Sequence, residues 1–145
     1  METGTGVAAV AHVISLAVAP VFLLSGIGAM LAVMTQRLAR VIDRARVLEM
    51  RLEANPGQEA VLHKQLATLS RRAKLVGRAI TLCTTTALLV CAVIAILFLG
   101  ASMGFDASTP VAILFVVAML SFFIGLLIFL REILVATASL RIGPK

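Results

Sequence analysis

Three long stretches of the chain contain no charged residue, and they restrict what the chain can fold into. They cover residues 3–36, 79–105 and 107–130 and hold 34, 27 and 24 residues. About 20 apolar residues cross a bilayer as a helix. Of the 145 residues, 61% are hydrophobic and 14% are charged, which is outside the range of ordinary soluble domains. The sequence therefore predicts an all-α membrane protein with three transmembrane helices.

The positions of the charged residues predict how the chain crosses the membrane. All thirteen Lys and Arg residues lie within residues 37–78 or from Arg131 onward. By the positive-inside rule, both basic segments are expected in the cytoplasm, with the N-terminus and the loop at Asp106 outside. The start METGTGVAAV lacks the basic residues of a signal peptide, so the first run is expected to be a retained span. The first expected segments are an outer N-terminus with the first span (1–36), a cytoplasmic basic helical hairpin (37–78) and a second span (79–105). They are followed by an outer loop with the third span (106–130) and a cytoplasmic tail (131–145).

The segment between the first two spans carries a heptad pattern of apolar residues on both sides of the breaker cluster Asn55-Pro56-Gly57. This pattern predicts two helices that are joined by a tight turn at residues 55–57 and packed as an antiparallel coiled coil. Facing layers of such a pair have a constant sum of residue numbers, and five pairs sum to 114: Leu38 with Val76, Val41 with Ala73, Ala45 with Leu69, Leu48 with Leu66, and Leu52 with Leu62. The first two spans are then expected to be the membrane halves of two long helices.

One edge of the predicted hairpin is basic. Arg37, Arg44 and Arg51 follow this edge on the first helix and face Gln65 and Arg72 on the second. Anionic lipid attracts each nearby Lys or Arg by ~1 kcal/mol, which favours a solvated or phosphate-facing edge. The alternative is an edge that is presented to another anionic partner. The opposite edge is small and mixed and is suited to pack on a neighbouring subunit: Ile42, Glu49, His63, Ser70 and Gly77.

Residues that could carry catalysis or bind a metal do not gather in this sequence. His12 and His63 are the only histidines, and no metal-ligand spacing is present. No nucleophile or acid/base constellation occurs, so the sequence indicates neither an enzyme nor a cofactor site. The hairpin carries four acids and no aromatic residue, which argues against nucleic acid as a partner. Glu132, next to Arg131, is expected to form a structural ion pair at the membrane edge.

Three stretches resemble a known family: LARVIDRARVLE (38–49), LSRRAKLVGRAI (69–80) and FLREILVATASLR (129–141). In this order around three spans, they are similar to a family of small bacterial membrane proteins that is known only as a domain of unknown function. The resemblance covers nearly the whole chain and implies a bacterial cytoplasmic (inner) membrane. It implies no activity, so no functional residue is transferred from it.

The first span differs from the others because polar and small residues lie on one face. With 100° per residue, His12, Ser15, Ala19, Phe22 and Gly26 fall within an arc of about 80°. The same arc continues into Arg37, Arg40, Arg44 and Arg51 of the hairpin. Together with Arg72 on the facing edge of the second hairpin helix, these residues are assigned to a basic mouth or to contact with anionic lipid. A structural interpretation is that the small residues let this span pack tightly.

The functional interpretation is a homo-oligomeric ion channel or pore, because three helices of one chain enclose no lumen. Under this hypothesis, Phe22 is an apolar constriction, and His12 and Ser15 line the outer vestibule. Arg37, Arg40 and Arg44 form positive rings that bias against cations at the inner mouth. The alternative is a membrane-anchored scaffold or sensor whose hairpin binds a protein partner or anionic lipid.

The second span is interpreted as a packing element. Gly100 and Gly104 in the second span form a GxxxG pair, which suits close contact between helices. The third span is the most uniformly apolar and is expected to face lipid.

Overall fold

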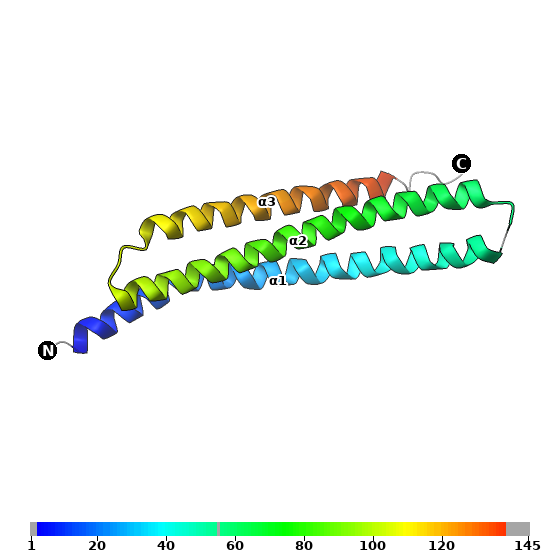
Figure 1. Cartoon of the computed structure of the whole chain (residues 1–145). Coiled ribbons are helices and arrows are strands. Elements are labelled where there is room, and N and C mark those ends of the chain that lie inside the picture. The colour runs from blue at the N-terminus through cyan, green and yellow to red at the C-terminus, as the bar shows by residue number, and fades with distance from the viewer. Residues whose placement is uncertain (1–2, 55, 139–145) are drawn as a thin grey trace. The chain divides into compact units, whose positions relative to one another are not determined.

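The computed structural model describes residues 3–54 and 56–138, which form three helices. Helix α1 spans Thr3–Ala54, α2 spans Glu59–Met103 and α3 spans Ser108–Ala138 (Figure 1). Each helix contains a stretch that is long and apolar enough to cross a membrane. The prediction of an all-helical protein with three helices of this kind is confirmed.

The first two helices are longer than any span requires. Helix α1 has 52 residues and α2 has 45, so at 1.5 Å per residue they are ~78 Å and ~68 Å long. The hydrocarbon core of a bilayer is ~30 Å thick, so both helices extend well beyond it. Pro20 lies inside α1 and leaves the carbonyl of Leu16 without its helical donor. The helix nevertheless runs through this position without a break.

The turn between α1 and α2 contains Pro56 and Gly57. Gly57 has a φ of 134°, which L side chains rarely adopt. The N–H of Leu62 donates to the carbonyl oxygen of Gln58 at 3.1 Å, which begins the hydrogen bonding of α2. Asn55, the first residue of the turn expected at 55–57, lies outside the described residues. Residues 139–145 of the expected tail also lie outside them.

The loop between α2 and α3 depends on two glycines. Gly104 has a φ of 69°, and its N–H donates to the carbonyl oxygen of Gly100 at 2.9 Å, which is a left-handed helix cap. A Cβ on Gly100 would lie 2.8 Å from the Cβ of Ala107. The spacing of Gly100 and Gly104 predicts a GxxxG motif for contact between helices. The structure instead gives both glycines a role in closing the loop.

The helices divide into two compact units, of which the first comprises residues 1–30 and 83–123. Its buried side chains come from all three helices and are mostly small or β-branched. Ile27 of α1, Val90 of α2 and Ala118 of α3 are almost fully buried, and so is the polar Thr86. This unit contains the larger part of each uncharged run.

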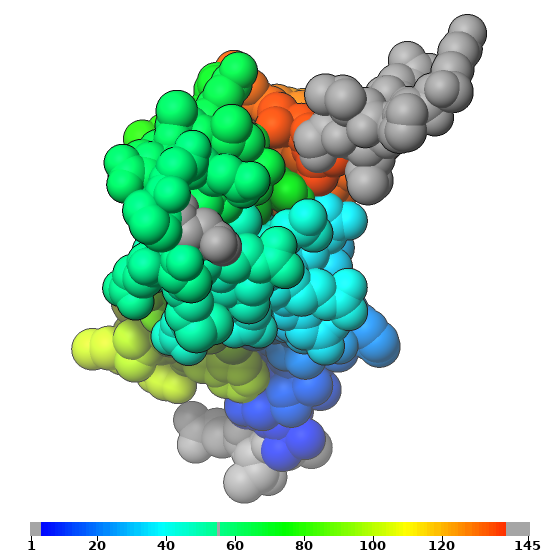
Figure 2. All heavy atoms as spheres, turned by 90° about the vertical axis from the view of Figure 1, so that its right-hand side faces the viewer, coloured from blue at the N-terminus to red at the C-terminus, as the bar shows by residue number. Residues whose placement is uncertain are grey.

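The second unit comprises residues 31–82 and 124–145. Its α1 and α2 segments lie side by side next to the turn, and the end of α3 lies beside α2 (Figures 1 and 2). One hydrophobic cluster joins the α1 and α2 segments through Val41, Ala45, Leu48, Leu52, Leu62, Leu66, Leu69 and Ala73. Of the remaining two residues predicted for this core, Val76 is buried and Leu38 is partly buried. Burial of each Leu or Val stabilises the fold by roughly 1.5–3 kcal/mol.

Candidate functional site

A buried carboxylate binds two arginines in the second unit. The side chain of Glu132 on α3 is 0% exposed. Its Oε2 accepts a hydrogen bond from Nη1 of Arg37 on α1 at 3.2 Å. Its Oε1 accepts from Nη2 and Nε of Arg72 on α2 at 2.9 and 3.2 Å. The Glu132 carboxylate therefore links all three helices.

The aromatic ring of Phe129 adds a further contact to this cluster. The guanidinium carbon of Arg37 lies 5.5 Å from the centroid of the Phe129 ring. Phe129 precedes Glu132 by three residues on α3, so both side chains lie on one face of that helix. A cation–π contact of this kind contributes roughly 0.5–2 kcal/mol. Arg37 is thus held by two groups of the same helix turn.

The two arginines of the cluster differ in their exposure to solvent. The Arg37 side chain is 39% exposed and the Arg72 side chain is 21% exposed. The cluster carries a net charge of +1 and acts as a structural connection between helices. Among the described residues, no group of His, Cys, Asp or Glu is placed to hold a metal ion.

The sequence predicts only part of this cluster. It predicts that Glu132 forms an ion pair at the membrane edge. It places Arg72 on the basic edge of the hairpin, facing the arginines of the first helix, and does not pair it with Glu132. The available signal is that Glu132 is the only acid within residues 107–138. A single acid on an otherwise apolar helix requires a basic partner on another helix if it is buried. The choice of Arg72 over its neighbours depends on how α2 and α3 are rotated about their axes.

The residues predicted to line a pore lie on the surface of the first unit. His12, Ser15, Ala19, Phe22 and Gly26 are all exposed, with Phe22 at 75%. In the second unit, the basic residues Arg40, Arg44 and Arg51 are exposed as well. Of the predicted basic residues, Arg37 and Arg72 are bound to Glu132 and belong to the buried cluster.

Asp106 shapes the start of α3. Its Oδ1 accepts hydrogen bonds from the hydroxyl of Ser108 at 2.6 Å and from the N–H of Ser108 at 2.9 Å. The hydroxyl bond and, after it, the backbone bond hold the pKa of Asp106 below its usual value. The carboxylate thereby satisfies one of the N–H groups that a helix start leaves open.

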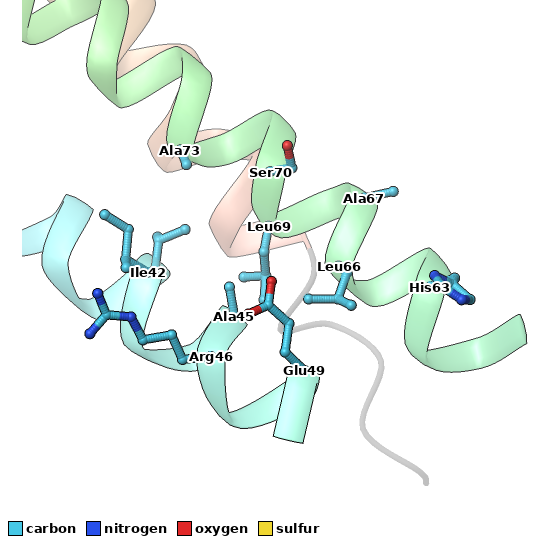
Figure 3. A pocket seen from close by; sticks show the side chains of 11 residues that line it. Ile42, Ala45, Arg46, Glu49, His63, Leu66, Ala67, Leu69, Ser70 and Ala73 are labelled. Atoms are coloured by element: carbon cyan, nitrogen blue, oxygen red, sulfur yellow. The ribbon is translucent and has the colours of Figure 1, made fainter. Parts of the chain in front are cut away.

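A groove of about 540 Å³ lies between α1 and α2 beside the hydrophobic cluster. Apolar residues such as Leu66 and Ala73 line it together with polar residues of both helices (Figure 3). Arg46 and Glu49 come from α1, and His63 comes from α2. Glu49 and His63 belong to the hairpin edge that is predicted to be small and mixed.

Together, the fold and the cluster define an all-helical membrane protein whose three long apolar helices are joined by one buried carboxylate. The chain belongs to the family described as "Protein of unknown function (DUF2721)", which matches residues 17–142. This match confirms the resemblance to a family of unknown function. No curated protein and no solved structure matches the chain.

Proposed function

We propose that the protein is a homo-oligomeric ion channel or pore of the bacterial inner membrane, lined by the membrane part of α1. The observation that carries this proposal is the exposed small and polar face of α1. His12 and Ser15 lie in an uncharged run, and no other helix in the described part of the chain buries them. Polar and ionisable residues in a membrane usually face a bundle interior or a water-filled cavity. Several copies around a common axis provide such an interior.

In this proposal the N-terminus is outside, and the turn between α1 and α2 lies in the cytoplasm. The α1 and α2 segments next to the turn form an antiparallel coiled coil in the register with the constant sum of 114. The shared cluster of Val41, Leu48, Leu62 and Leu69 supports this arrangement. Arg40 and Arg44 supply the positive rings at the inner mouth. Arg37 contributes less, because Glu132 partly neutralises it.

The test is ion flux from liposomes that contain the purified protein, compared with empty liposomes. If Phe22 is an apolar constriction, Phe22→Ala raises flux and Phe22→Trp lowers it, because an apolar gate conducts when water wets it. The matched control is Phe123 on α3, which is 59% exposed and lies outside the proposed lining. The same two substitutions at Phe123 should leave flux unchanged.

The basic mouth has its own test. Arg40→Gln combined with Arg44→Gln should shift selectivity toward cations. Added salt should reduce the difference, since exposed charges are screened over ~8–10 Å at physiological ionic strength. If the pore is active but the Phe22 substitutions leave its flux unchanged and the Arg40 and Arg44 substitutions leave its selectivity unchanged, α1 does not line it. Native mass measurement in detergent gives the number of subunits, and a single subunit contradicts the pore.

The second candidate function is a membrane-anchored scaffold or sensor. The groove between α1 and α2 favours it, since a mostly apolar lining with a few polar groups is typical of binding sites. The ligand in this case is a protein partner or anionic lipid at the hairpin. Absence of flux under voltage, osmotic tension and altered pH would support this candidate. The Arg40 and Arg44 substitutions should then weaken binding to anionic liposomes.

A further inference from the structure

A second groove, of about 510 Å³, lies between α2 and α3 where the charged part of α2 meets its apolar run. Its lining residues fall into a basic pair, an apolar pair and a small polar pair. They are Lys74 and Arg78, Leu82 and Ile128, and Gly77 and Thr81. The groove therefore has a cationic part on the hairpin side and an apolar part on the side of the uncharged run.

The cationic part has no internal counter-charge. Lys74 and Arg78 lie one helical turn apart on the same face of α2, where like charges repel. Both are exposed, and neither has an ion-pair partner among the described residues. The acid on the adjacent helix, Glu132, is buried and bound to other arginines, while its neighbour Arg131 adds another exposed cation. An anion from outside the chain would therefore meet two cations and no competing acid among the residues that line the groove.

The groove is open at Gly77, which lies between Lys74 and Arg78 in the sequence. A Cβ at Gly77 would meet no atom within 4 Å, so the space above the residue is empty. The carbonyl oxygen of Gly77 accepts a hydrogen bond from the hydroxyl of Thr81 at 3.0 Å. This bond uses the hydroxyl within the helix. Leu82 and Ile128 form the apolar wall on the side of the uncharged run.

We propose that this groove binds an anionic phospholipid. Lys74 and Arg78 hold the phosphate group, and one acyl chain lies along Leu82 and Ile128. The order of cations and then apolar wall along α2 matches the order of headgroup and chain in a lipid. Basic pockets between transmembrane helices at the membrane boundary bind anionic headgroups. Free phosphate would satisfy the cations but leave the apolar wall in water, so the lipid is the better match. This site is separate from the pore lining and does not depend on conduction.

The test is native mass spectrometry of the full chain in detergent, titrated with phosphatidylglycerol or phosphatidylcholine. The full chain should bind phosphatidylglycerol more tightly than phosphatidylcholine. Lys74→Gln combined with Arg78→Gln should weaken binding of phosphatidylglycerol by about 10- to 30-fold, because each cation near the headgroups contributes several-fold. The matched control is Lys64→Gln with Arg71→Gln, which removes the same charges from exposed positions of α2 outside both grooves. The control should bind like the unmodified chain.

A second variant tests the open space beside the two cations without changing charge. Gly77→Leu fills the groove and should reduce binding of phosphatidylglycerol several-fold. Gly28→Leu is its control, since a Cβ at Gly28 also meets no atom within 4 Å. Circular dichroism verifies that each variant keeps its helices.

The outcomes distinguish a lipid site from a phosphate site and from attraction by positive charge in general. Equal binding of the two lipids, or an equal loss in the Lys74/Arg78 and Lys64/Arg71 variants, overturns the proposal. Inorganic phosphate at millimolar concentration serves as a further competitor. If it displaces phosphatidylglycerol and Gly77→Leu has no effect, the site binds a phosphate group and not a lipid.

Discussion

Burial of the Glu132 carboxylate costs free energy, and the two arginines that bind it offset this cost. Moving a carboxylate out of water costs several kcal/mol unless it is paired and hydrogen-bonded. Three N–H donors from Arg37 and Arg72 meet its two oxygens. The arginines in turn depend on Glu132, because both lie partly buried beside apolar helix surfaces. The stability of the contact between the three helices should therefore be sensitive to this one residue.

Replacing Glu132 with Gln should lower the free energy of unfolding by about 3 kcal/mol. This is the lower end of the range for breaking a buried pair, because both arginines keep contact with solvent. Glu53→Gln is the control, since Glu53 is an exposed acid on α1 and should change stability by less than about 0.5 kcal/mol. Thermal or denaturant unfolding in detergent measures both. Equal values for the two variants would contradict a structural role for Glu132.

The turn at Asp106 predicts a pH dependence at the start of α3. The folded-state pKa of Asp106 is lowered, so its contribution to stability is present above the unfolded pKa and is lost as pH falls through the folded pKa. Ser108→Ala removes the larger cause, so the pKa of Asp106 should rise toward its ordinary value. An NMR titration of the Asp106 carboxyl carbon measures this shift. Ser102→Ala, which removes a hydroxyl bonded to the Phe98 carbonyl, should leave it unchanged.

The two helix segments next to the turn have a register that cross-linking can test. In a chain without Cys83 and Cys91, cysteines at Leu48 and Leu66 should cross-link efficiently within one molecule, because the constant sum pairs these positions. Cysteines at Leu48 and Leu62 are one turn out of register and should cross-link far less. Equal yields, or cross-links between chains, would mean that the segments pair in another way.

The three long helices could be predicted from the sequence because their signals are local. Charge-free runs define the apolar stretches, and a Pro-Gly pair with 3,4 apolar spacing predicts the residues that gather in the cluster around Leu48 and Leu69. The pairing of Arg72 with Glu132 could not be predicted in the same way. Helix α3 is apolar on nearly all sides, so its sequence gives little information about which face meets α2. That rotation is fixed by packing between distant segments.

The whole molecule has an expected orientation that chemical labelling can check. Since every Lys and Arg lies in residues 37–78 or from Arg131 onward, the positive-inside rule places Gln58 inside and Ser108 outside. Single cysteines at these exposed positions, in a chain without Cys83 and Cys91, should differ in intact cells. An impermeant reagent should label the cysteine at 108 and not the one at 58. Labelling at 58 would reverse the orientation.

The position of Glu132 in the third helix also bears on how the protein is made. During synthesis α1 and α2 emerge before α3, so Arg37 and Arg72 exist for a time without the carboxylate that they later share. In that interval the apolar cluster around Leu48 and Leu69 can already join the first two helices. Packing of α3 against the first two helices then brings the missing negative charge to the two arginines. The last helix thus completes an ionic contact whose other two members are already in place, so a chain that stops before α3 leaves two arginines without their acid.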